Sequence, residues 1–134
     1  MQKNNLTEDY LECILILNRS KGLVRSIDIV RRLGVTKPTV SAMMKKLVEK
    51  NFINIDEDRY ITLTEKGSKV AKRVYDKHLM LGGFLIKIGV NKEKALEEAG
   101  VIEHIICDET YECLEKLYES TLFNTYASKV INAK

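Results

Sequence analysis

The chain has 134 residues, of which 45% are hydrophobic and 31% charged, so we expect a globular protein of one domain or of two small ones. Its net charge is only +3, but residues 1–75 carry 15 Lys and Arg against 9 Asp and Glu, whereas residues 76–134 carry 7 against 10. This asymmetry favours an anion-binding module followed by a pairing surface or a cation site. The sequence shows neither a signal-peptide core nor a long uncharged apolar run, and its three cysteines lack CxxC spacing, so we expect a cytoplasmic protein without a disulfide framework, a zinc knuckle or a membrane span.

Two helices are predicted at the start of the chain. Thr7 can cap a helix from about Glu8 to Arg19, whose apolar residues form one broad face. After a stop at Lys21-Gly22, Ser26 can cap a second helix, over residues 27–33.

A basic amphipathic helix follows the turn at Gly34. Thr36 can cap this helix, and Pro38 has a backbone φ suited to a first helical turn. Apolar residues then recur at spacings of four and three as one buried stripe, namely Val40, Met44 and Leu47. The other face has hydroxyls near its N-terminus and ammonium groups further along, which is the order that a helix-turn-helix recognition helix needs, although an ordinary surface helix with a solvated lysine face is the alternative. We expect Thr36, Lys37, Pro38, Thr39 and Ser41 in a DNA groove, and Lys45, Lys46, Arg25 and Arg59 on phosphates.

A two-stranded hairpin is predicted next. Residues 52–55 and 60–63 alternate apolar and polar side chains, and Asp56-Glu57-Asp58-Arg59 lies between them. This is the pattern of the wing of a winged helix, although its mostly acidic tip leaves only Arg59 suited to a phosphate contact. We therefore predict a mainly α-helical chain in which residues 1–73 form a winged helix-turn-helix DNA-binding domain.

The second part, residues 74–134, is predicted to be helical throughout. Thr64 can cap a long helix to Ile88, and Gly82-Gly83 within it indicates a kink or the close approach of another helix. The remaining elements are a helix capped by Asn91 that runs to about Cys107, a helix from Glu109 to about Glu119 capped by Asp108, and a short helix or frayed tail over residues 121–134.

Several polar residues occupy positions where apolar ones would be expected. Asp9, Glu12 and Cys13 share one face of the first helix, His78 lies on the apolar stripe of the long helix, and Glu103-His104 interrupts an apolar run. Each has an ordinary structural explanation, such as a hydrogen-bonded core histidine or compensation of a helix dipole. Burying these carboxylates and imidazoles together without a cation would leave uncompensated charge, so a metal is the simpler explanation if the helices converge. Imidazole with carboxylate suits Mn(II), Fe(II) or Zn(II).

Short motifs recur along the chain in a characteristic order and spacing. They are Glu8-Asp9-Tyr10-Leu11-Glu12, Val35-Thr36-Lys37-Pro38-Thr39-Val40-Ser41, Leu63-Thr64-Glu65-Lys66-Gly67, Val74-Tyr75-Asp76-Lys77-His78, Leu85-Ile86-Lys87-Ile88-Gly89-Val90, Ile102-Glu103-His104 and Asp108-Glu109. In these motifs the chain, from Thr7 to about Leu117, resembles the diphtheria-toxin-repressor family of metal-activated transcription factors, and in particular its short manganese-responsive members.

This resemblance implies a homodimer built on the C-terminal helices, with a divalent metal as co-repressor that orients two winged helices on a double-stranded DNA operator. Carried over position by position, the implied metal ligands are Asp9, Glu12, His78, Glu103 and His104. The iron-responsive branch has methionine at the position of Asp9, so the hard oxygen donor here favours Mn(II) over Fe(II) as the cofactor.

The sequence departs from the family pattern at Gly100. The family has a further glutamate or cysteine ligand at this position. The secondary metal site of the iron-responsive branch is also incomplete, because the glutamate that it requires would fall at Gly82. Glu97, Cys107 and Cys13 are candidate substitutes, and the number of metals stays open.

A metal-independent winged-helix regulator that responds to a small ligand or to cysteine oxidation is the alternative function. An enzyme is not expected, because the sequence contains no HExxH, no GxSxG and no phosphate-cradling glycine loop.

Overall fold

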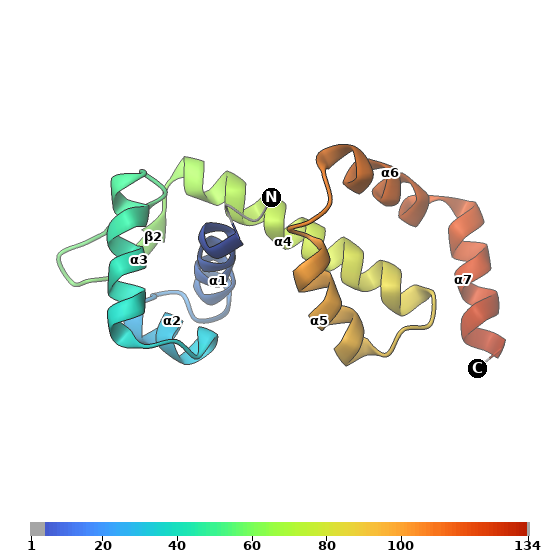
Figure 1. Cartoon of the computed structure of the whole chain (residues 1–134), viewed down its shortest axis with the longest axis horizontal. Coiled ribbons are helices and arrows are strands. Elements are labelled where there is room, and N and C mark those ends of the chain that lie inside the picture. Colours follow the sequence, from blue (N-terminus) through green and yellow to red (C-terminus); the bar gives the residue numbers. More distant parts are fainter. Residues whose placement is uncertain (1–4, 134) are drawn as a thin grey trace. The chain divides into compact units, whose positions relative to one another are not determined.

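The computed structural model of the chain describes residues 5–133 and confirms a mainly helical fold with one small sheet (Figure 1). The chain divides between Val74 and Tyr75 into two compact units, the winged-helix unit (described over residues 5–74) and the helical unit (residues 75–133). The predicted division into two functional domains near this point stays a prediction. The elements are α1 (Asn5–Lys21), α2 (Ser26–Leu33), α3 (Lys37–Glu49), β1 (Ile53–Ile55), β2 (Ile61–Leu63), α4 (Glu65–Lys87), α5 (Lys92–Ile102), α6 (Asp108–Glu119) and α7 (Thr121–Ala133).

The winged-helix unit has its own hydrophobic core, to which α1, α2, α3, the hairpin and the first part of α4 contribute. The predicted stripe of α3 is confirmed, because Val40, Met44 and Leu47 are all buried. Burial of these side chains leaves the opposite face of α3 to solvent. The largest fully buried side chains of this core are Leu11, Ile14, Ile29, Leu47, Ile53, Ile61, Val24 and Val40.

The hairpin is the predicted wing. Its strands β1 and β2 are antiparallel, with Ile53 opposite Leu63 and Ile55 opposite Ile61. A third segment joins it, because the backbone N of Ile61 donates to the carbonyl of Val24 at 2.7 Å, just before α2. The wing is therefore attached to the helix-turn-helix through its returning strand.

Two predicted helix caps in this unit are wrong. Helix α1 already runs through Asn5 and Leu6, so Thr7 lies inside the helix. Ser26 is the first residue of α2, and Arg25 occupies the cap position. The carboxylate of Asp28 accepts from the Arg25 backbone N at 2.9 Å, and the Asp28 backbone N donates to the Arg25 carbonyl at 3.0 Å, so these bonds hold the start of α2.

In the helical unit, the Gly82-Gly83 pair permits close approach of two other helices, one of the two predicted roles. A side-chain carbon at position 82 would lie 3.0 Å from Leu96 of α5, and one at position 83 would lie 2.5 Å from the Tyr118 hydroxyl of α6. Next to this contact, Phe84 stacks on Phe123 of α7 with ring centroids 4.7 Å apart. The glycines thus let α5 and α6 pack directly on α4.

Helix α6 is also attached to α4 by a buried lysine. Lys77 is only 9% exposed, and its Nζ lies 3.7 Å from Asp108 Oδ1 and 5.5 Å from the ring centroid of Tyr111. Burial and a hydrogen bond to Glu115 raise the pKa of Tyr111 to about 12. These contacts fix the start of α6 beside the turn of α4 that carries His78.

Helix α5 is shorter than predicted. It begins after Asn91, whose side chain accepts from two backbone N–H groups as expected, but it ends at Ile102 and not near Cys107. His104 N donates to Val101 O, and Ile105 N donates to Ile102 O, so the chain tightens into i→i+3 turns.

The last stretch of the chain is helical, since α7 covers Thr121–Ala133, and Cys107 rather than Asp108 holds the cap position of α6. Within residues 5–133 no helix combines the length and the apolar character that a membrane crossing requires.

Candidate metal centre and DNA-binding surface

Three of the five predicted metal ligands come together in the helical unit. His78 lies on α4, and Glu103 and His104 lie just beyond the end of α5. His78 Nδ1 is 3.2 Å from Glu103 Oε2, and His104 Nε2 is 3.5 Å from Glu103 Oε1. One carboxylate therefore lies between two imidazoles.

Glu103 and His104 lie in the tight turns that follow Ile102. Their side chains meet there, with His104 Nε2 beside Glu103 Oε1. The sequence-based view that this pair lies inside a helix was wrong, and the role of the pair as metal ligands together with His78 stays a prediction.

The residues in this cluster fit a divalent metal. The side chain of Glu103 is 2% exposed and that of His104 is 5% exposed, so the carboxylate is almost completely removed from water. A buried carboxylate needs compensation by a positive charge, and imidazole nitrogen with carboxylate oxygen is a suitable donor set for Mn(II), Fe(II) or Zn(II). His78 and His104 offer the nitrogens and Glu103 the oxygens of such a set.

The other two predicted ligands belong to the winged-helix unit. Asp9 and Glu12 both lie on α1 and are both half-buried. Their spacing of three residues puts them on one face of this helix. Their place in a metal site with the three residues of the helical unit stays a prediction.

Gly100 lies directly beside the imidazole of His78. A side-chain carbon at position 100 would be 3.6 Å from His78 Cε1 and 3.8 Å from Nδ1, which is ordinary van der Waals contact. Packing therefore does not require glycine at position 100. The consequence of this glycine is that no side-chain donor atom is present at this position next to His78.

The three candidate substitutes have different surroundings. Glu97 and Cys107 are exposed, and Cys107 Sγ lies 3.5 Å from the Thr110 hydroxyl, which lowers its pKa. Cys13 is 3% exposed in the core of the winged-helix unit, and burial raises its pKa to about 11. A thiol that stays protonated in an apolar core is a poor metal ligand.

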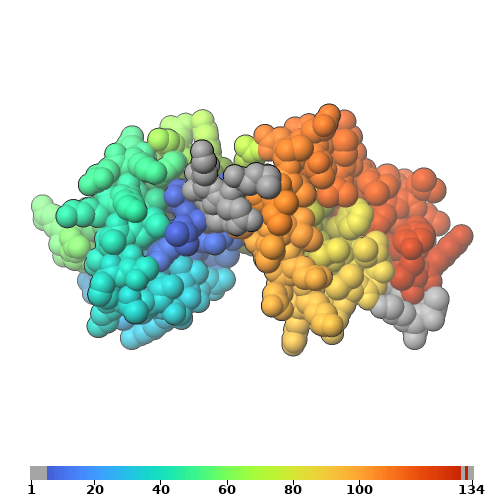
Figure 2. All heavy atoms as spheres, in the orientation of Figure 1, coloured from blue at the N-terminus to red at the C-terminus, as the bar shows by residue number. Residues whose placement is uncertain are grey.

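The predicted DNA-contacting residues of α3 form an exposed surface on the winged-helix unit. Figure 2 shows the side chains of α3 at the surface of this unit. Thr36 caps the helix, accepting from the Thr39 backbone N, and the two hydroxyls lie 2.7 Å apart. The residues exposed here are Thr36, Lys37, Pro38, Thr39, Ser41, Lys45 and Lys46.

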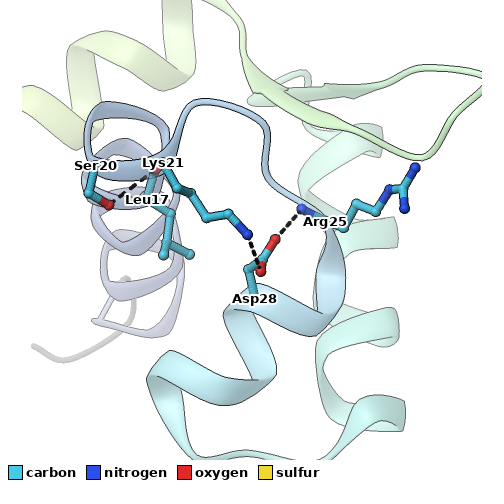
Figure 3. A network of polar contacts seen from close by, with 5 residues as sticks. All are labelled: Leu17, Ser20, Lys21, Arg25 and Asp28. Atoms are coloured by element: carbon cyan, nitrogen blue, oxygen red, sulfur yellow. Dashed lines mark hydrogen bonds and ion pairs between the residues drawn. The ribbon is translucent and has the colours of Figure 1, made fainter.

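Arg25 and Arg59, the other two residues predicted to contact DNA, are exposed near the wing. Arg59 has a positive φ of 70° at the tip of the hairpin. The Arg25 guanidinium lies over the ring of Tyr60, with Cζ 4.3 Å from the ring centroid. Figure 3 shows the Arg25 side chain directed away from Asp28, which bonds the Arg25 backbone N and Lys21 Nζ. All the residues predicted to bind DNA are thus accessible on one unit.

Both units match known families along the sequence. The family described as "Iron dependent repressor, N-terminal DNA binding domain" matches residues 4–60, and "Iron dependent repressor, metal binding and dimerisation domain" matches residues 64–129. The transcriptional regulator MntR of Escherichia coli O6:H1 is 36% identical over 108 residues, which cover 81% of this chain and 70% of that protein. The chain belongs to the diphtheria-toxin-repressor family.

Solved structures of the diphtheria-toxin-repressor family also resemble the chain. The crystal structure of T. acidophilum IdeR matches with a TM-score of 0.75 and 30% identity, over 84% of this chain and 54% of that one. The manganese regulator SloR matches with a TM-score of 0.72 and 33% identity, over 81% of this chain and 51% of that one. The chain therefore spans about half the length of these solved structures.

Sequence reasoning missed three residues that organise the surface predicted to bind DNA. Lys21 and Asp28 support the backbone of Arg25, and Tyr60 supports its side chain. The spacing of Arg25 and Asp28, which places the acid at the third helical position, was the one available signal. The contact between Arg25 and Tyr60 has no local sequence signal, because the two residues lie far apart along the chain.

Proposed function

We propose that this protein is a metal-dependent, DNA-binding transcriptional repressor that controls metal homeostasis in the cytoplasm. The observation that carries this proposal is the buried Glu103 carboxylate between His78 and His104, in a chain whose other unit is a winged helix with an exposed basic recognition helix. A metal cluster alone suits many functions, and a winged helix alone suits many regulators. The two together favour a regulator whose DNA binding depends on a metal.

The proposed metal ligands are the three clustered residues together with two carboxylates of α1. We assign His78, Glu103, His104, Asp9 and Glu12 to this site. When bound, a divalent cation would compensate the buried Glu103 carboxylate and connect ligands that belong to both units.

Mn(II) or Fe(II) is the proposed cofactor. The carboxylate of Asp9 is a hard oxygen donor, which favours Mn(II). The relative SloR is described as a manganese regulator, which supports the same choice. Gly100 removes one possible donor beside His78, so a single ion with a small ligand set is the simplest stoichiometry.

DNA binding would follow from metal binding through a shift of populations. We propose a homodimer in which residues 74–134 pair and residues 1–73 contact a double-stranded operator. A dimer reads two half-sites about one DNA turn, roughly 34 Å, apart. A metal that joins α1 to the helical unit would favour the arrangement with this spacing, and coupling between two sites is typically about 1–3 kcal/mol.

The decisive experiment adds metal while DNA binding is measured. The preferred duplex is first selected from a random-sequence library with Mn(II) present, and its affinity is then measured by fluorescence anisotropy with Mn(II), Fe(II), Zn(II) or chelator. We expect chelator to weaken binding about 5- to 150-fold. Equal affinity with metal and with chelator would contradict the proposal.

Variants separate the metal site from the rest of the fold. Asp9→Asn combined with His78→Ala should abolish the response to metal, whereas Glu98→Gln, on the exposed face of α5, should retain it. Glu103→Gln should weaken Mn(II) binding in calorimetry about 10- to 100-fold or more, since it removes the carboxylate shared by both imidazoles. An unchanged metal response in the Asp9→Asn/His78→Ala variant would exclude these residues as ligands.

A further inference from the structure

The wing and the start of α2 meet in a specific contact between Arg25 and Tyr60. Their backbones are brought together by the neighbouring hydrogen bond from Ile61 N to Val24 O, which is 2.7 Å long. The Arg25 guanidinium then lies over the Tyr60 ring at 4.3 Å from the centroid. An exposed arginine side chain is therefore held by a residue of the wing.

This contact leaves the hydrogen-bonding edge of Arg25 accessible. Stacking uses the face of the guanidinium, whereas its N–H donors lie in the plane of the group. The nearest acid along α2 is Asp28. Its Oδ1 accepts a hydrogen bond from Lys21 Nζ at 2.6 Å, and its Oδ2 accepts one from the Arg25 backbone N at 2.9 Å (Figure 3). Both of its oxygens are engaged away from the guanidinium.

The backbone of Tyr60 is itself held in place by the hairpin. Tyr60 is half-buried, and its backbone N donates to Asp56 Oδ1 at 2.9 Å. Asp56 N returns a bond to the Tyr60 carbonyl at 3.0 Å. One acidic residue of the wing tip, Asp56, thus has a structural role, because it orders the turn that carries Tyr60.

We propose that Tyr60 is a positioning residue, which holds the Arg25 guanidinium in the orientation that contacts a DNA phosphate. The ordering of a long side chain normally costs conformational entropy when a complex forms. The stack on Tyr60 orders Arg25 before DNA arrives, and Lys21 with Asp28 fixes its backbone. This inference rests on the proposed DNA-binding function.

The test is the salt dependence of DNA binding in a double-mutant cycle. The full chain with Mn(II) is titrated onto a labelled mixed-sequence duplex at several salt concentrations, using the wild type, Tyr60→Phe, Tyr60→Leu, Arg25→Ala and the Arg25→Ala/Tyr60→Leu double variant. Tyr60→Phe keeps the ring and should bind as the wild type does. Tyr60→Leu should bind roughly three- to tenfold more weakly. Arg25→Ala should reduce the salt slope by about 0.9 for each phosphate that the arginine neutralises in the wild type.

Coupling between the two substitutions distinguishes positioning from a general effect on the wing. In the Arg25→Ala background, Tyr60→Leu should have no further effect, because the group that it positions is gone. Lys45→Ala, which removes another cation predicted to contact a phosphate, is the matched control on α3, and its effect should add to that of Tyr60→Leu. Wild-type affinity of Tyr60→Leu, or an equal effect of Tyr60→Leu with and without Arg25, would overturn the inference.

If Tyr60→Leu does not fold, Arg25→Lys tests the positioning of Arg25 with Tyr60 intact. Lysine keeps the charge but lacks the planar group, so affinity should fall while the salt slope stays unchanged. Wild-type affinity of Arg25→Lys would overturn the inference. Failure of the wild-type chain to bind any duplex would overturn the proposed function itself, and this inference with it.

Discussion

Gly67, in the first turns of α4, packs against the backbone carbonyl of Phe52, so that a side-chain carbon at position 67 would overlap with its oxygen. The same carbonyl accepts from the Thr64 backbone N at 3.0 Å and from the Thr64 hydroxyl at 3.1 Å. The junction between α3, β1 and α4 is thus built on a backbone contact that only glycine allows.

We expect Gly67→Ala to destabilise the winged-helix unit by about 1–3 kcal/mol, because neither backbone can move without breaking these hydrogen bonds. Urea unfolding followed by circular dichroism measures this change. Gly100→Ala is the matched control in α5, where the added carbon meets only ordinary contacts, 3.6 Å from His78 Cε1. Since alanine is a better helix former, that control should be neutral or stabilising by up to about 1 kcal/mol. Equal unfolding midpoints for Gly67→Ala and the wild type would contradict the close packing.

A second prediction concerns acid sensitivity of α2. The hydrogen bond from Lys21 and that from the Arg25 backbone hold the pKa of Asp28 below its ordinary value of 3.8. The charged form is therefore favoured in the folded state, so its contribution to stability is present above pH 3.8 and is lost as the pH falls through the lowered pKa.

Asp28→Asn should destabilise the protein by about 1 kcal/mol at pH 7, since it weakens the cap of α2. The difference from the wild type should shrink as the pH falls below about 4. Urea midpoints between pH 7 and pH 3 measure the difference. Asp58→Asn, an equal change of charge at the exposed hairpin tip, serves as the control. A difference that stays constant over this pH range would show that the charge of Asp28 contributes nothing.

Local patterns in the sequence were enough to predict most of the winged helix. Thr36, Pro38 and the buried stripe of Val40, Met44 and Leu47 specify α3, and alternation specifies the two strands. In each case the local conformational preference of the residues agrees with the tertiary structure that they form. The predicted end of the recognition helix, near Asn51, therefore lies close to its observed end at Glu49.

Features that depend on non-local contacts were predicted less well. The end of α5 at Ile102 was missed because helical phase continues through Glu103-His104 in the sequence, and only the observed turns show where hydrogen bonding changes. The shared face of Asp9 and Cys13 suggested one environment, yet Cys13 is packed into the core. Periodicity gives the direction of a side chain but not what packs against it.

The cysteines provide a test of the alternative function, a regulator that responds to oxidation. Burial raises the pKa of Cys13 to about 11, whereas the hydrogen bond with the Thr110 hydroxyl lowers the pKa of Cys107, which is exposed. Thiolate is the reactive form, so at pH 7 Cys13 stays almost entirely in the unreactive thiol form. We expect a chromogenic disulfide reagent to modify Cys107 first, Cys113 next and Cys13 only on unfolding.

Replacement of Thr110 by valine should slow the reaction of Cys107 and leave that of Cys113 unchanged. If the metal-dependent function is correct, modification of Cys107 should leave the metal response of DNA binding intact. Loss of DNA binding on mild oxidation, with the Cys107→Ser variant protected, would support the alternative regulator instead.

The exposed lysines of α3 allow a last prediction about DNA recognition. Lys45 lies on the surface of α3 opposite its buried stripe, whereas the hydroxyls of Thr36 and Thr39 are near the N-terminus of this helix. An ammonium group at this position suits a phosphate, which carries no sequence information. Lys45→Ala should therefore weaken binding to specific and random duplexes alike, and it should reduce the salt slope by about 0.9 for each phosphate that the lysine neutralises in the wild type.

Ser41→Ala should instead change the preference among sequences and leave the slope unchanged. Lys92→Ala, at the exposed start of α5, is the charge-matched control and should bind as the wild type does. An unchanged slope for Lys45→Ala would remove this residue from the interface.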